Sequence, residues 1–181
     1  SRRWKLIGES ILGFGLLFHG MELMSTSLEP LRNSAVFADI IAQFAQHPML
    51  GVLIGIIGTA IVQSSSAFTA VVLALAMQDL VTLESGVALV LGSNIGTCVT
   101  ALLASIGGGV TALRVAVAHL LFNTVGVVLF LLIFNPFTSL ISLTSPVVAR
   151  QLANAHTLFN VAYTLLFLPF VGVFVKFLER I

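Results

Sequence analysis

Charged residues are scarce in this chain of 181 residues. They make up 8% of the sequence, whereas hydrophobic residues make up 58%, and soluble domains usually carry about 25% charged residues. A soluble protein of this length could not bury so much apolar surface, because its surface-to-volume ratio is too high. The composition therefore excludes an ordinary soluble domain and predicts an integral membrane protein surrounded by the lipid bilayer.

Cysteine and net charge are limited as well. Cys98 is the single cysteine, which excludes an internal disulfide and a metal cluster built from cysteines. The net charge of +1 gives no basic face for nucleic acid. No cleavable signal peptide is visible, since the apolar run after residues 1–5 continues as an ordinary helix. The chain does not begin with Met, and we expect it to come from a longer protein.

The apolar segments predict a single all-α membrane domain with about four transmembrane helices, each of about 20 residues. Residues 1–47 hold the first span, at 6–28, and an amphipathic helix that lies at the membrane interface. Residues 84–109 form a third apolar stretch that is broken in its middle. Two more spans occupy residues 110–181, separated by a polar loop with Asn135-Pro136 and Ser145-Pro146. Pro169 is expected to kink the last span.

Residues 48–78 are interrupted by four consecutive polar residues, Gln63-Ser64-Ser65-Ser66. Each apolar half has about 13 or 14 residues, or roughly 20 Å of helix, which reaches only the middle of a bilayer. This predicts a re-entrant helical hairpin with its polar tip at the midplane, and a single bent span is the alternative.

The tip of this hairpin has the features of an ion site. Serine is a good helix N-cap, and the free N–H groups of a helix start, with the hydroxyls of Ser64, Ser65 and Ser66, favour an anion. Carbonyl groups at the end of the first half, with Thr59 nearby, could equally hold Na⁺. The alternative is that the serines only bind neighbouring helices. No Lys or Arg lies between Asn33 and Leu113, so co-bound Na⁺ would have to neutralise an anion, or the site is purely cationic.

A second polar segment, Gly92 to Thr97, predicts an unwound stretch of helix. The oxygens of Ser93, Asn94 and Thr97 suit an alkali cation, while the glycines let the backbone open. The alternative is that these glycines serve close helix packing. Gly51, Gly55 and Gly58 fall at helical spacing, and for them tight packing is the favoured interpretation.

The sequence also contains an internal repeat: residues 116–123 and 153–160 agree at six of eight positions. Each copy places a histidine and an asparagine four residues apart, on one face of a helix. These pairs are His119 with Asn123 and His156 with Asn160. We expect them to form hydrogen bonds between helices, with support of an ion site as the second possibility.

The basic residues favour one orientation in the membrane. Six of them fall on the side of both termini and two on the other, which predicts cytoplasmic termini. An intramembrane hydrolase using Ser65 and His119 is disfavoured, because no nucleophile-elbow spacing is present. We therefore expect no enzyme activity. An oligomeric ion channel lined by the same serines stays an alternative.

The chain resembles the sodium/phosphate cotransporter family, which includes the type II renal and intestinal carriers and bacterial relatives. The resemblance covers residues 6–177 and rests on Gly58-Thr59-Ala60 before Gln63-Ser64-Ser65-Ser66, on Gly92 to Thr97, and on the two Ala-His-x-Leu-Phe-Asn runs. It implies Na⁺-coupled symport of inorganic phosphate by alternating access, with no cofactor beyond the coupling ion. It also implies that Gln63 to Ser66 contact phosphate and Na⁺.

Family members carry two inverted copies of the Gln-Ser-Ser-Ser unit, whereas this chain has one. The resemblance is strongest to the second half of the bacterial transport core, so it implies one half of an inverted-repeat transporter. The other half would come from a second copy in a homodimer or from another segment, and without it the chain would not transport. Phe68 and Ser93 stand where relatives commonly have Thr and Ala. By resemblance, Asn94 and Thr97 support the sodium sites.

Overall fold

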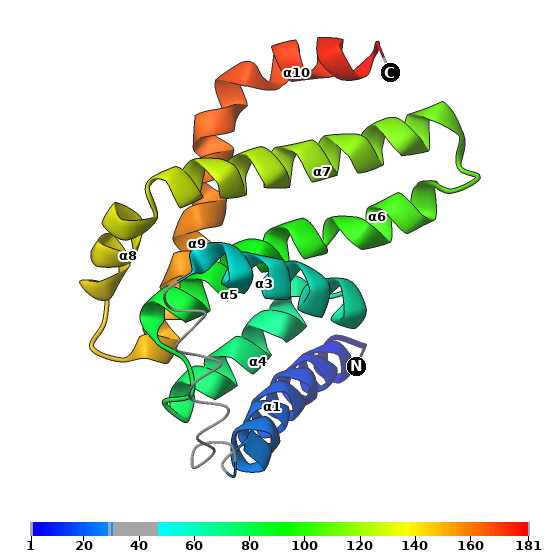
Figure 1. The fold of residues 1–181 in the computed structure, drawn as a ribbon. Helices are drawn as coiled ribbons and strands as arrows, with labels where there is room; N and C mark the ends of the chain where they lie inside the picture. Colours follow the sequence, from blue (N-terminus) through cyan, green and yellow to red (C-terminus); the bar gives the residue numbers. More distant parts are fainter. Residues whose placement is uncertain (1, 29, 31–46, 181) are drawn as a thin grey trace.

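The computed structural model describes residues 2–28, 30 and 47–180 (Figure 1). Every regular element in these ranges is helical, which confirms the all-α fold class. The amphipathic helix predicted within 29–47 lies almost entirely outside the described residues. The main helices are α1 (Arg2–Leu28), α3 (Pro48–Val62), α4 (Ser65–Met77), α5 (Leu83–Gly96), α6 (Cys98–Ser105), α7 (Gly109–Leu132), α8 (Phe134–Ser142), α9 (Val148–Phe167) and α10 (Val171–Leu178).

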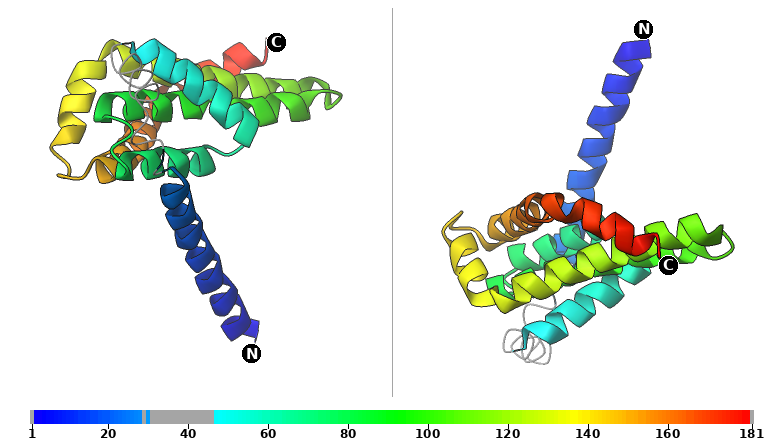
Figure 2. Two further views of the ribbon diagram at one scale, coloured as in Figure 1. Left: turned by 60° about the horizontal axis from the view of Figure 1, so that its bottom comes forward. Right: turned by 90° about the horizontal axis from the view of Figure 1, so that it is seen from above.

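Among the described residues, four helical segments are long and apolar enough to cross a membrane. They are Arg2–Met24, Leu83–Ser105, Gly109–Leu132 and Val148–Leu178. These segments coincide with the four spans predicted from the sequence. The helix α1 projects away from the other helices (Figure 2) and packs on α4.

The predicted break between α3 and α4 is confirmed, and two residues produce it. Gln63 ends α3 in a left-handed conformation, with φ of 59°, and Ser64 is extended. Ser64 then caps α4, because its hydroxyl accepts a hydrogen bond from the amide of Ala67 at 3.2 Å. Capping supplies a partner to an amide that the helix itself leaves free. The two helices leave the break as the arms of a V (Figure 1).

The stretch predicted to be unwound or broken at Gly92 to Thr97 is divided at Thr97, where α5 gives way to α6, but it is not unwound. The helix α5 continues through Gly96, the amide of Thr97 donates to the carbonyl of Ser93, and α6 starts at the next residue. The reason is that the glycines serve packing. A Cβ atom at Gly92 would collide with the backbone carbonyl of Val52 in α3, and one at Gly96 would lie within 2.7 Å of the Thr59 Cβ.

Tight packing of α3 was predicted from its own glycines, and the structure confirms it. A Cβ at Gly55 would collide with the backbone carbonyl of Leu89, and one at Gly51 would lie 2.7 Å from the Ala88 Cβ. Gly58 instead faces the ring of Phe68 within the hairpin. Small residues on both helices therefore bring the α3 and α5 backbones into direct contact.

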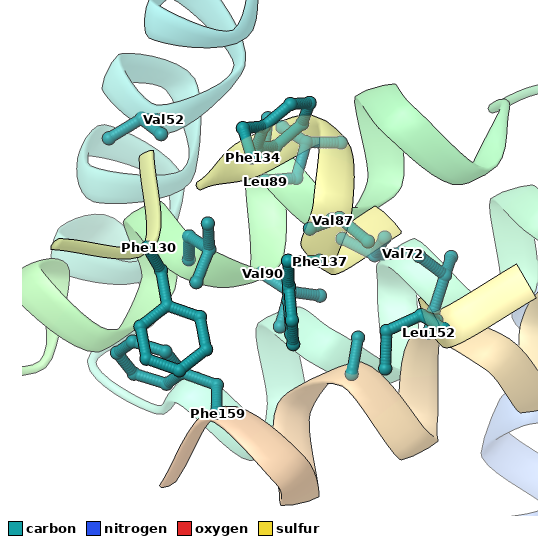
Figure 3. Close-up of a cluster of buried hydrophobic side chains, with 14 of the residues drawn as sticks. Val52, Val72, Val87, Leu89, Val90, Phe130, Phe134, Phe137, Leu152 and Phe159 are labelled. Atoms are coloured by element: carbon teal, nitrogen blue, oxygen red, sulfur yellow. The ribbon is translucent and has the colours of Figure 1, made fainter. Parts of the chain in front are cut away.

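The polar loop predicted around Asn135-Pro136 is in part a helix. Residues Phe134–Ser142 form α8, which buries Phe137 and Ile141. Proline is tolerated in the first turn of a helix, so Pro136 does not prevent it. The Phe137 ring meets Phe130 edge to face at 4.9 Å, in a core that also contains Phe159 (Figure 3).

The kink predicted at Pro169 is confirmed. Leu168–Phe170 form a short 3₁₀ turn, and α10 leaves it in a new direction (Figure 1). At the end of α10, the Arg114 guanidinium donates to the carbonyl of Glu179 at 2.7 Å. This bond ties α7 to the last residues of the described chain.

The contact between α3 and α5 can be tested with a single methyl group. We expect Gly92→Ala to lower the free energy of unfolding by about 1–3 kcal/mol or more, because overpacking a close contact forces the backbones apart. Gly15→Ala is the matched control, since nothing lies within 4 Å of that position. The measurement is unfolding of the purified protein in mixed detergent micelles. Equal stability of the two variants would contradict the proposed packing.

Candidate functional site

A cavity of about 290 Å³ lies where α4, α5, α7 and α9 meet. Its lining consists of hydroxyl, amide and imidazole side chains, and none is an acidic, lysine or arginine residue. The lining residues are Ser65, Asn94, Thr97, His119, Asn123, His156 and Asn160. Each of these seven was singled out from the sequence, although they are distributed over nearly a hundred positions of the chain.

The start of α4 forms one wall of this cavity. Ser65 is the first residue of α4 and is half-buried, so the break at Gln63 and Ser64 presents a helix N-terminus to the cavity. The Ser64 and Ser66 hydroxyls lie 3.1 Å apart and hydrogen bond to each other. A helix N-terminus with hydroxyl groups attracts negative charge.

Three asparagines contribute amide oxygens. Each side-chain amide N–H donates to a carbonyl one turn earlier in its own helix, with distances of 2.9 Å for Asn94 to Val90, 3.0 Å for Asn123 to His119 and 2.8 Å for Asn160 to His156. Their Oδ1 atoms accept no hydrogen bond from the residues that the structure describes. Such oxygens are the ligands that hard cations prefer.

Among the described residues, the hydrogen bonds expected between side chains of the repeated His–Asn pairs and other helices are limited to that of Asn123 with the Cys98 thiol of α6. The Asn amides bond within their own helices, and neither imidazole bonds to any part of the chain that the structure describes. Both histidines are half-buried and line the cavity. The repeat therefore places two unpaired imidazoles, one from α7 and one from α9, around the same space.

Five of the predicted site residues lie outside this cavity. Gln63 is exposed, Ser64 is used in the cap, and Ser66 lines a separate, mostly apolar cavity of about 570 Å³ between α1 and α4. Ser93 is fully buried, and its hydroxyl donates to the Val90 carbonyl at 2.7 Å. Thr59 is also fully buried, and its Oγ1 has no partner among the described residues.

Thr69 lies four residues after Ser65 in α4, a spacing that places two side chains on one helix face. Its Oγ1 is buried and unpartnered within the described ranges, but Thr69 does not line the cavity. A hydrogen bond near the site also connects two helices. The Cys98 thiol donates to the His119 carbonyl at 3.5 Å and so links α6 to α7.

Comparison with known proteins identifies the family. Residues 19–145, more than half of the chain, match the family described as Na⁺/Pi-cotransporter. The chain belongs to this family. Because family members are carriers and four helices can cross a membrane, this member of the cotransporter family is a multi-pass membrane protein.

Several curated proteins resemble this member of the family. The chain is 35% identical over 142 residues to a Bacillus subtilis (strain 168) protein named Uncharacterized protein YqeW, covering 78% of the chain and 46% of that protein. It is 43% identical over 95 residues to human Sodium-dependent phosphate transport protein 2B, covering 50% of the chain and 14% of that protein. Human protein 2C gives 43% over 88 residues, with 46% and 15% covered. The chain thus spans less than half the length of these relatives, and no solved structure matches it.

The position of the cavity can be tested with a pair of cysteines in a Cys98→Ala background. Ser65→Cys is expected to react with a charged thiol reagent at least about tenfold faster than Ser93→Cys. The reagent must reach the thiol, and of these two positions Ser65 borders the cavity whereas Ser93 is fully buried. Labelling is followed by mass spectrometry of the protein in lipid nanodiscs. Faster labelling of Ser93→Cys would contradict the described arrangement.

Proposed function

We propose that this chain takes part in sodium-coupled symport of inorganic phosphate by alternating access. The observation that carries the proposal is the convergence of the start of α4, just after the helix break at Gln63 and Ser64, with polar residues of α5, α7 and α9 on one uncharged cavity. Human relatives of this family are named for sodium-dependent phosphate transport. A carrier is therefore favoured over an enzyme.

Phosphate is proposed to bind at the start of α4, to Gln63, Ser64, Ser65 and Ser66. Free amide groups of a helix start and serine hydroxyls are hydrogen-bond donors, which is what an oxyanion requires. Ser65 borders the cavity directly. Binding of Gln63 and Ser66 to the same anion would need side-chain rearrangement or a second wall, because both are exposed on the present surface.

Sodium is proposed to bind beside the phosphate, to oxygens of Thr59, Ser64, Ser65, Ser93, Asn94 and Thr97. Support for this comes from the amide oxygen of Asn94, which has no donor among the described residues, and from the unpartnered Oγ1 of Thr59. The proposed coupling between Na⁺ and phosphate follows from the lack of positive charge in this part of the chain. Residues 48–113 contain no Lys or Arg, so a phosphate anion in a low-dielectric site needs the cation for its binding to be favourable.

The complete transport site is proposed to need a second, inverted repeat. The chain spans 46% of the Bacillus subtilis relative, and Gln63 and Asn160 at the border of the site are exposed. The second half would come from another segment or from another copy of this chain, although an inverted copy would run against the distribution of Lys and Arg, which favours cytoplasmic termini. In this arrangement residues 48–78 form a re-entrant hairpin in the cell membrane.

The proposal is tested by equilibrium binding and uptake of ³²P-phosphate. Purified chain in nanodiscs is expected to bind phosphate only with Na⁺, and Ser65→Ala to weaken binding about tenfold or more, because it removes a hydrogen bond to a charged group. Ser139→Ala is the control, since Ser139 is exposed on α8.

Uptake into proteoliposomes with an inward Na⁺ gradient then separates a complete transporter from a half. Uptake that Ser65→Ala abolishes would mean that copies of this chain assemble the site. Binding without uptake would mean that a different repeat is required. Absence of Na⁺-dependent phosphate binding by folded protein would refute the proposed function.

A further inference from the structure

Basic side chains gather at one end of the helix bundle. Between residues 83 and 180 the chain has six charged residues, and four of them lie where the end of α10 meets the beginning of α7 (Figure 1 and Figure 2). They are Arg114 of α7 and Lys176, Glu179 and Arg180 of α10 and the turn that follows it. Three positive charges therefore stand here against one negative charge.

The guanidinium of Arg114 joins α7 to the end of α10. It donates to the backbone carbonyl of Glu179 at 2.7 Å, and its Nε has no hydrogen-bond partner among the described residues. None of Arg114, Lys176 and Arg180 pairs with an acidic side chain within the described ranges. Since a backbone carbonyl carries no net charge, the positive charge of this cluster is left for a ligand outside the chain.

Exposed apolar side chains lie beside these charges on α10. This helix packs on the bundle through buried Leu178 and through Phe174, whose ring meets an aromatic ring of α9 edge to face at 5.0 Å. The opposite face carries Val173, Phe177 and Arg180, because spacings of four and three residues place side chains on one side of a helix. Val173 is 72% exposed and Phe177 is 52% exposed. An apolar helix face that ends in basic residues suits the boundary between lipid hydrocarbon and headgroups.

We propose that Arg114, Lys176 and Arg180 bind the phosphate group of an anionic phospholipid, whose acyl chains lie along Val173 and Phe177. Guanidinium and ammonium groups donate charge-assisted hydrogen bonds to phosphate oxygens, and basic pockets between membrane helices bind anionic headgroups. The distribution of Lys and Arg predicts that this side faces the cytoplasm, whose membrane leaflet contains anionic lipids. The inference goes beyond the proposed transport function, because none of these residues lines the cavity.

The apolar neighbours favour a lipid over free phosphate at this cluster. Both ligands would use the three cations, but only a phospholipid also covers exposed apolar surface. Such surface is present on α7 as well, since Val110 and Leu113, four residues and one residue before Arg114, are 56% and 42% exposed. Cations and apolar side chains from two helices therefore match both parts of a phospholipid.

The test uses one tryptophan as a local reporter of the bound lipid. Trp4 is the single tryptophan of the chain, so Trp4→Phe combined with Phe177→Trp leaves one indole, on α10. The protein is placed in bilayers that mix phosphatidylcholine with phosphatidylglycerol, and one of the two lipids carries brominated acyl chains, which quench an indole that they contact. The quenching gives the relative affinity of the two lipids at α10. We expect phosphatidylglycerol to bind at least about fivefold tighter, the factor that one basic residue contributes near an anionic surface.

Two comparisons locate the preference. Adding Lys176→Gln and Arg180→Gln should bring the relative affinity close to one, and both side chains are exposed. Adding Arg2→Gln and Arg3→Gln on α1 removes the same number of charges and should leave the preference at α10 unchanged. Phe14→Trp in the same tryptophan-free background places the indole in α1, away from these basic residues, and should show no preference.

Equal quenching by the two brominated lipids at Phe177→Trp would overturn the inference. An equal fall in the α1 variant and in the α10 variant would also overturn it, because the effect would then come from the overall charge of the protein. If the α10 variant loses ³²P-phosphate binding while Phe177→Trp shows no lipid preference, the cluster takes free phosphate and the inference is wrong.

Thermal unfolding shows whether the α10 variant is folded. Where it is not, the single variants Lys176→Gln and Arg180→Gln replace it, and at least one of them must lower the preference for phosphatidylglycerol. If both single variants fold and keep the full preference, these residues do not form the lipid site.

Discussion

The site depends on the direct contact between the backbones of α3 and α5. Gly55 and Gly92 lie opposite carbonyl groups of the facing helix, and a single added carbon at either position would collide with them. Because α3 is held so close, its last turn is fixed against the end of α5, with Thr59 against Gly96. After the break at Gln63, α4 starts with Ser65, which lines the same cavity as Asn94 and Thr97.

The chemistry of this cavity follows from which hydrogen bonds its side chains have already made. The asparagine N–H groups are used by their own helices, which leaves amide oxygens for cations. The start of α4 and its serine hydroxyls provide donors for an anion. The cavity has no fixed charge of its own. In the proposed function it holds Na⁺ and phosphate in neighbouring places, where each ion makes the binding of the other more favourable, and this is the physical basis of the proposed coupling.

Much of this arrangement could be predicted from the sequence, because local signals determine it. Segment length gave the four spans, and consecutive serines after Gln63 gave the break and its cap. Two predictions failed because a local signal had two meanings. Glycines at Gly92 and Gly96 permit unwinding, but they equally permit the close packing that the structure contains, and Pro136 marks an early position of a helix rather than a loop.

The convergence of the site could not be predicted from the sequence alone. Nothing local says that His119 and His156 border the same cavity as Ser65, since this depends on how α7 and α9 pack around α5. The aromatic core fixes that packing, with Phe130 against Phe159 at 4.8 Å and Phe122 against Tyr163 at 4.6 Å. Sequence spacing identified these residues as candidates, and tertiary packing decides which of them meet.

The most direct test of this account is anomalous diffraction from crystals of the protein grown with Na⁺ and arsenate, a phosphate analogue whose arsenic atom can be located. The account predicts one strong arsenic peak in the cavity, within hydrogen-bonding distance of Ser65 and absent when choline replaces Na⁺. A peak elsewhere on the molecule, or one that persists when choline replaces Na⁺, would contradict it.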